Sequence, residues 1–83
     1  MKYPVYSYRD RLVGFGTPVL DQSDASAIRG FAYAVSNREG IMNFSPADYE
    51  LYKCGEFDTD TGKLIPKDIP ELVCTGLNAM EMK

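Results

Sequence analysis

The chain has 83 residues, of which 45% are apolar and 25% charged, and its net charge at neutral pH is −3. A chain of this length forms one small domain that buries about 60–65% of the surface exposed by its unfolded form, so a deep catalytic cleft is not expected. The apolar content excludes wholesale disorder, and the acidic balance opposes strong nonspecific binding to nucleic acid.

No apolar run is long enough to span a bilayer, and the N-terminus lacks the apolar stretch of a secretion signal. We therefore expect a protein without membrane contact, located in the cytoplasm of the cell that makes it. In that compartment Cys54 and Cys74 are expected as free thiols, although a disulfide between them is the alternative. Histidine is absent, so the commonest general base and zinc ligand are missing. We expect no catalytic residues, no metal and no cofactor.

The first two predicted strands cover residues 3–9 and 12–20. Residues 3–9 hold Val5 and three tyrosines, and β-branched and aromatic side chains favour a pleated sheet. Residues 12–20 contain Gly14, Gly16 and Pro18. Because proline donates no hydrogen bond to a strand ladder, this second strand is predicted to be short and to lie at a sheet edge.

One amphipathic helix is predicted over residues 23–36. Ser23 is suited to cap its N-terminus, and Asp24 places negative charge at the positive end of the helix dipole. The apolar side chains recur at i, i+3, i+4 and i+7, which marks one helical face. They are Ile28, Phe31, Ala32 and Val35. This spacing predicts that the helix packs on one face of the sheet.

A third strand is predicted at residues 50–58, after a short proline-led turn at residues 45–48. Regular alternation places Leu51 and Phe57 on the same face of this strand. Neither face is cleanly polar, which is typical of a central strand. The run D-T-D-T-G at residues 58–62 is turn chemistry, with Gly62 in the left-handed conformation.

A fourth strand is predicted at residues 63–65, and Pro66 and Pro70 are predicted to stop regular pairing after it. The sequence thus predicts an α+β fold, a small antiparallel sheet with the order β-β-α-β-β along the chain and one helix packed on it. The domain covers residues 1–66, and residues 67–83 form an irregular C-terminal tail. A homodimer that buries further apolar surface would suit such a small core.

Two groups of side chains are candidates for function. The acids Glu56, Asp58 and Asp60 are open to two interpretations, a structural turn or a metal site, but they lack the remaining ligand spacing of a calcium loop. Tyrosines could stack on unpaired bases while arginines contact phosphates, or the tyrosines could fill the core or an interface between subunits. The candidate nucleic-acid-binding residues are Tyr6, Tyr8, Arg9, Arg11 and Arg29.

Three stretches carry a family resemblance: K-Y-P-V-Y-S-Y-R-D at the start, T-P-V-L-D-Q-S-D-A-S-A-I-R-G-F before and into the helix, and D-Y-E-L-Y-K-C-G-E-F-D-T-D-T-G-K-L. In this order they resemble the small nonstructural protein of gokushovirus-type microviruses, phages with single-stranded DNA genomes. The resemblance implies a protein made in the infected bacterium, absent from the virion, and associated with viral DNA replication or with the switch to single-stranded synthesis and packaging. It implies no catalytic residue.

We therefore expect a non-enzymatic phage accessory protein in the host cytoplasm. Its expected partners are single-stranded viral DNA or replication proteins. The alternative is a protein-interaction module, monomeric or homodimeric, that binds a host factor or a capsid-assembly intermediate.

Overall fold

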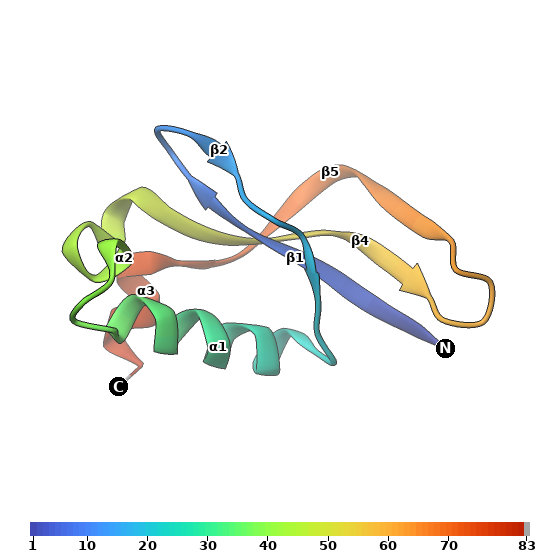
Figure 1. The fold of residues 1–83 in the computed structure, drawn as a ribbon, viewed down its shortest axis with the longest axis horizontal. Coiled ribbons are helices and arrows are strands. Elements are labelled where there is room, and N and C mark those ends of the chain that lie inside the picture. Colours follow the sequence, from blue (N-terminus) through green and yellow to red (C-terminus); the bar gives the residue numbers. More distant parts are fainter. Residues whose placement is uncertain (83) are drawn as a thin grey trace.

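A curled antiparallel sheet and one long helix account for most of the chain (Figure 1), which the computed structural model describes over residues 1–82. The long strands are β1 (Lys2–Asp10), β4 (Tyr49–Asp58) and β5 (Leu64–Thr75). The short strands β2 (Gly14–Phe15) and β3 (Val19–Leu20) both pair with β1. The strand order is β2-β1-β4-β5. The α+β class, the edge position of residues 12–20 and the central position of β4 are confirmed.

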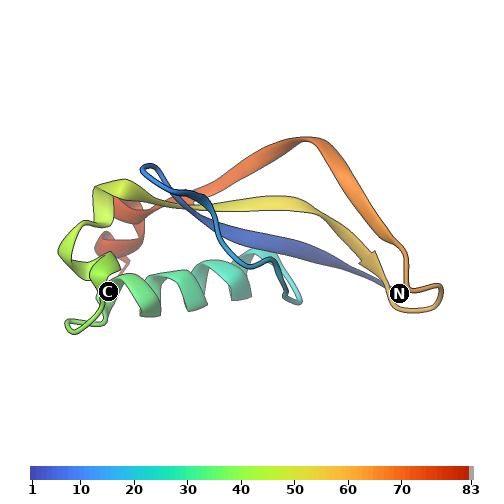
Figure 2. The same cartoon turned by 45° about the horizontal axis from the view of Figure 1, so that its top comes forward.

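The longest helix, α1 (Asp24–Ser36), lies along one face of the sheet (Figures 1 and 2). The hydroxyl of Ser23 accepts a hydrogen bond from the backbone N–H of Ser26 at 3.2 Å, as its capping role predicts. Three shorter helical segments follow: α2 (Ile41–Phe44), the 3₁₀ turn η1 (Pro46–Asp48) and α3 (Gly76–Glu81). Within residues 1–82, none of the helices has the length and apolar character needed to cross a bilayer.

The core lies between α1, the sheet and α3. Phe31 and Val35 of α1 are fully buried against Leu51 of β4 and Tyr6 of β1. Each such side chain stabilises the fold by about 1.5–3 kcal/mol relative to an exposed position. The core is confined to one end of the molecule, because α1 runs under only part of a sheet that extends the molecule to 40 Å (Figure 1).

The prediction that Leu51 and Phe57 share a face is wrong. Leu51 lies opposite Tyr8 of β1, whereas Phe57 lies opposite Tyr3, and residues 3 and 8 of one strand point to opposite faces. The register of β1 and β4 slips at Cys54, where Val5 pairs with Gly55 and Tyr6 with Lys53. One extra residue in β4 forms a bulge there and reverses the alternation beyond it.

The predicted irregular tail is also wrong. Strand β5 continues through Pro66 and Pro70 to Thr75, and α3 follows directly. Both prolines are compatible with the strand because β5 is an edge strand, where half of the N–H groups need no partner. Ala79 of α3 is fully buried in the core, so the folded domain includes the segment after residue 66.

Candidate nucleic-acid interface

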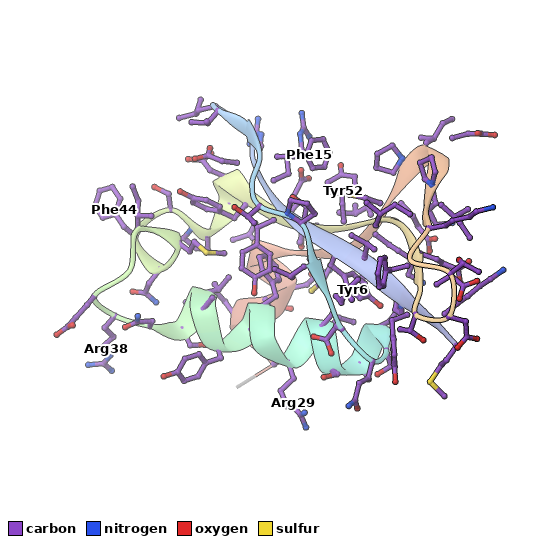
Figure 3. The ribbon with its side chains drawn as sticks, turned by 45° about the vertical axis from the view of Figure 1, so that its right-hand side comes forward. Tyr6, Phe15, Arg29, Arg38, Phe44 and Tyr52 are labelled. Atoms are coloured by element: carbon purple, nitrogen blue, oxygen red, sulfur yellow. The ribbon has the colours of Figure 1, made fainter. Side chains whose placement is uncertain are left out.

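The face of the sheet that α1 leaves uncovered carries a cluster of three side chains, Arg9, Phe15 and Tyr52, called here the aromatic platform (Figure 3). The rings of Phe15 and Tyr52 meet edge to face, with centroids 5.3 Å apart and planes at 77°. The guanidinium carbon of Arg9 lies 5.9 Å from the Phe15 centroid and 6.0 Å from the Tyr52 centroid. These distances are those of cation–π contact.

Strand register produces this cluster. Arg9 of β1 stands directly opposite Phe15 of β2 on one side and Glu50 of β4 on the other. Ser7 stands opposite Tyr52. Directly opposed residues of antiparallel strands point to the same face, and residues two apart along a strand do so as well. Three strands therefore deliver these side chains to one surface.

A hydrogen bond and an ion pair fix the position of the platform. The buried hydroxyl of Ser7 donates a hydrogen bond to the carbonyl oxygen of Gly16 at 3.0 Å, which fixes the segment after β2 against β1. A guanidinium nitrogen of Arg9 lies 3.1 Å from a carboxylate oxygen of Glu50. Phe15 nevertheless keeps 50% of its surface exposed, so a flat apolar ring remains available to a ligand beside a positioned cation.

An apolar hollow of about 340 Å³ lies further along the same face. Two of its lining residues, Val5 and Cys54, lie two positions along their strands from Ser7 and Tyr52 respectively. Its apolar lining also includes Pro18, Leu64, Ile65 and Pro66. Because Val5, Ser7 and Arg9 alternate along β1, the hollow lies on the same face of the sheet as the platform.

The structure separates the five residues predicted to contact nucleic acid. Tyr6 is 1% exposed and donates its hydroxyl to Asp24, so it is a core residue and is not available for stacking. The ring of Tyr8 packs on Phe31 of α1 with centroids 5.0 Å apart, on the covered face of the sheet. Burial raises the pKa of Tyr8 and, together with the hydrogen bond to Asp24, that of Tyr6. The alternative interpretation, tyrosines in the core, holds for both.

The three arginines lie at three different places. Arg9 belongs to the aromatic platform. Arg11 follows in the turn after β1, where its guanidinium is 3.8 Å from the carboxylate of Asp48. Arg29 projects from α1 on the far side of the molecule from Phe15 and Tyr52 (Figure 3). Arg9 and Arg11 can therefore serve one ligand, and Arg29 belongs to another surface.

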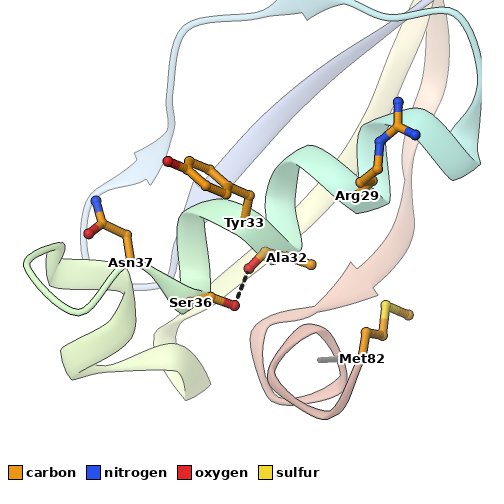
Figure 4. Close-up of a pocket in the computed structure, with 6 residues that line it drawn as sticks. All are labelled: Arg29, Ala32, Tyr33, Ser36, Asn37 and Met82. Atoms are coloured by element: carbon orange, nitrogen blue, oxygen red, sulfur yellow. Dashed lines mark hydrogen bonds between the residues drawn. The ribbon is translucent and has the colours of Figure 1, made fainter.

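That other surface is a hollow of about 370 Å³ between α1 and α3 (Figure 4). Arg29, Tyr33 and Met82 are among its lining residues. The hydroxyl of Ser36 is already used, because it donates to the carbonyl oxygen of Ala32 at 2.6 Å. Tyr33 is 79% exposed. The hollow thus offers one ring and one cation, without the second ring that the platform has.

Neither Phe15 nor Tyr52 is among the five residues that the sequence predicted to contact nucleic acid. The signal for Phe15 is its position between Gly14 and Gly16 in a strand predicted to lie at an edge. Short glycine-flanked edge strands have little to cover a phenyl ring, so an aromatic there is exposed. Alternation alone places Tyr52 on the face opposite Leu51, but it does not say which of the two faces α1 leaves uncovered.

The carboxylates of Asp58 and Asp60 in the acidic turn already have partners within the chain. The carboxylate of Asp58 accepts the N–H of Asp60 at 2.9 Å, which lowers the pKa of Asp58. The N-terminal ammonium lies 2.8 Å from an oxygen of Asp60. Gly62 has a φ of 76°, as the turn prediction requires. Among residues 1–82, no three metal-ligating side chains gather into a possible metal site.

Both cysteines carry free thiols, as predicted, and burial raises the pKa of each. Cys74 is buried in the core, and Cys54 is half-buried at the bulge.

The model of the Phage ORF5 protein family covers residues 3–79. No curated protein and no solved structure matches the chain.

Proposed function

The chain belongs to the Phage ORF5 protein family, and from this membership we propose a non-enzymatic accessory protein that acts in the synthesis or packaging of viral single-stranded DNA. The resemblance to the small nonstructural protein of gokushovirus-type microviruses supports this role. It acts in the cytoplasm of the infected cell, by binding single-stranded DNA or the replication machinery.

The observation that carries the proposal is the aromatic platform. Unpaired bases stack on exposed aromatic rings, and each stacked base contributes about 1–3 kcal/mol whatever its sequence. Phe15 and Tyr52 supply two rings on a face that no helix covers. Arg9 and Arg11 lie at the same end of the sheet, where they can neutralise phosphates of the bound strand.

The charges set the strength of this binding. Each of the two arginines has a carboxylate partner, Glu50 for Arg9 and Asp48 for Arg11, and the net charge of the chain is −3. We therefore propose that stacking supplies most of the affinity and phosphate contact a smaller part. Two neutralised phosphates on a single strand correspond to a slope of about −1.4 for log affinity against log salt.

The test is fluorescence anisotropy with a labelled single-stranded oligonucleotide of about 12 nucleotides, a length suited to one small binding domain. Phe15→Ala and Tyr52→Ala should each weaken binding by about 5- to 150-fold, the equivalent of one stacked base. Arg9→Ala should weaken it as well and reduce the salt slope by about 0.7.

The control is Tyr33→Ala, which removes a tyrosine of α1 that is 79% exposed and lies outside the aromatic platform. It should leave DNA binding unchanged. If Tyr33→Ala and Arg29→Ala weaken binding while the platform variants do not, the site is the hollow between α1 and α3. Absence of any binding at low salt would refute the proposed function.

A second candidate function is a protein-interaction module. The exposed apolar side chains of β5 favour it, because all of them lie outside the aromatic platform.

A further inference from the structure

Strand β5 leaves an unusual amount of apolar surface in water. Its first nine residues are all exposed. Among them Leu64 is 69% exposed, Ile69 81% and Leu72 47%. An exposed edge strand also presents backbone groups to a partner strand. A chain with so small a core gains stability from covering this surface.

The middle of β5 forms an arch away from β4 (Figure 2). Pro66 pairs with Gly55 and Glu71 with Lys53, so residues 67–70 of β5 span a single residue of β4. A side chain at Gly55 would collide with the backbone of residues 65 and 66, which shows how closely the strands approach at the foot of the arch. Ile69 is one of these four residues between the paired Pro66 and Glu71.

Opposite charges lie two residues before and two residues after Ile69, at Lys67 and Glu71. The ammonium of Lys67 lies 3.4 Å from a carboxylate oxygen of Glu71 in the same chain, and both side chains are partly exposed. An antiparallel copy of β5 related by a two-fold axis at Ile69 would set Lys67 opposite Glu71 of the second copy, Pro66 opposite Leu72, and Ile69 opposite itself. Opposite charges then meet twice, the two Ile69 side chains meet each other, Pro66 meets Leu72, and Asp68 stands opposite Pro70.

We propose that the arch of β5 is a self-association surface whose occupant is the β5 arch of a second copy, related by a two-fold axis at Ile69. Neighbouring registers lose the complementarity. An axis at Asp68 would oppose Lys67 to Ile69, and an axis at Pro70 would oppose Glu71 to Ile69. A two-fold contact of this kind closes on itself, so it produces a dimer and no filament.

The prolines shape this contact. Pro66 and Pro70 donate no hydrogen bond, so a long continuous ladder between the two copies is excluded. The contact is held mainly by the side chains around Ile69. A two-fold axis perpendicular to the sheet leaves the uncovered faces of both copies on the same side. The dimer therefore presents two aromatic platforms on one surface, although its formation does not depend on DNA binding.

Sedimentation velocity over a range of protein concentrations tests the proposal. The wild-type chain should sediment as a dimer. Lys67→Glu and Glu71→Lys should each raise the dissociation constant by about tenfold or more, because each places like charges opposite one another twice. Lys63→Glu makes the same change of charge in the turn before β5 and should leave the dimer intact.

Mixing the two variants separates contact between copies from contact within one chain. Neither variant can restore its own Lys67–Glu71 pair, yet a heterodimer of the two recreates both intermolecular pairs. The mixture should therefore dimerise at concentrations where each variant alone is monomeric. Ile69→Cys should form a disulfide-linked dimer under mild oxidation, whereas Asp60→Cys, on an exposed turn, should not.

The proposal would be overturned if the wild-type chain remained monomeric at a protein concentration of about 1 mM. The dissociation constant would then exceed about 1 mM, which is too weak for a stable dimer. So would a mixture that associates no better than its components. Either result would identify Pro66 and Pro70 as protection of an edge that stays unpaired. Anisotropy with DNA is a separate readout, so failure of the dimer and failure of the proposed function are distinguishable.

Discussion

The hydroxyl of Tyr6 donates a hydrogen bond to the carboxylate oxygen Oδ1 of Asp24. The ammonium of Lys53 lies 2.9 Å from the same oxygen. One carboxylate at the first turn of α1 thus connects the helix to β1 and β4. The hydrogen bond from Tyr6, ahead of the contact with Lys53, holds the pKa of Asp24 below its ordinary value. This three-residue link joins the covered face of the sheet to the start of the helix.

Replacing Tyr6 with phenylalanine should lower the free energy of unfolding by about 1–1.5 kcal/mol, because a partly buried hydrogen bond to a charged group is lost while the ring stays in place. Urea unfolding monitored by circular dichroism measures this change. Tyr33→Phe is the control, since Tyr33 is 79% exposed and its hydroxyl is available to water. Equal stability of the two variants would show that the link contributes nothing.

Asp24 should make stability depend on acid. Its folded pKa is lowered, so its contribution is complete above the unfolded value of about 3.9 and is lost as pH falls through the folded value. Asp24→Asn should therefore be less stable than wild type at pH 7, and the two should converge as pH falls below about 4. Urea midpoints across pH 2–7 measure this. A constant difference over that range would contradict the assignment. The effect is modest because the Asp24 side chain is 46% exposed.

Two glycines should respond oppositely to alanine. At Gly76 a Cβ would overlap the carbonyl oxygen of Pro46 and press on that of Tyr49. Gly76→Ala should lower stability by about 3 kcal/mol, since backbone must shift to admit it. Gly30 lies within α1 with nothing near the place of a Cβ. Gly30→Ala should raise stability by about 0.5–1 kcal/mol through helix propensity. Thermal and urea unfolding of both variants decide the matter, and a similar response at both sites would contradict this packing.

Helix α3 should be essential to the fold. Ala79 is fully buried in the core, so Ala79→Asp would leave an unpaired charge there and should destabilise the protein by about 3 kcal/mol or more. Met82 is 57% exposed, and Met82→Asp is the control that should behave as wild type. Limited proteolysis and near-ultraviolet circular dichroism report the difference. Indifference to both changes would mean that the segment after β5 is the irregular tail predicted from sequence.

Local signals predicted the parts of the fold that depend on neighbouring residues. The capping serine and the i, i+3, i+4, i+7 spacing identify α1, and the turn residues before Gly62 identify the hairpin of β4 and β5. Pro66 and Pro70 misled the prediction of β5, because a proline is unfavourable only where a partner strand needs its N–H. Which strand lies at the edge is a property of the whole sheet. The alternation of apolar and polar residues in the sequence does not show which strand lies at the edge.

The site was predictable in part for the same reason. Arg9 was chosen for its charge, and the structure gives it two aromatic neighbours. Tyr6 and Tyr8 were chosen for their rings, yet residues 6 and 8 of β1 face the helix, and residues 7 and 9 face away from it. The side of a strand that a helix will cover depends on packing between distant segments. Alternation predicts two faces without saying which one is exposed.

Strand β1, the first element along the chain, lies in the interior of the sheet. It has β2 and β3 on one side and β4 on the other. During synthesis β1 emerges long before Tyr49–Asp58 can pair with it, and the core stays open until Ala79 arrives. Folding is therefore a late event, completed after most of the chain has left the ribosome. Until then, the tyrosine-rich strand β1 is exposed to chaperones and to aggregation.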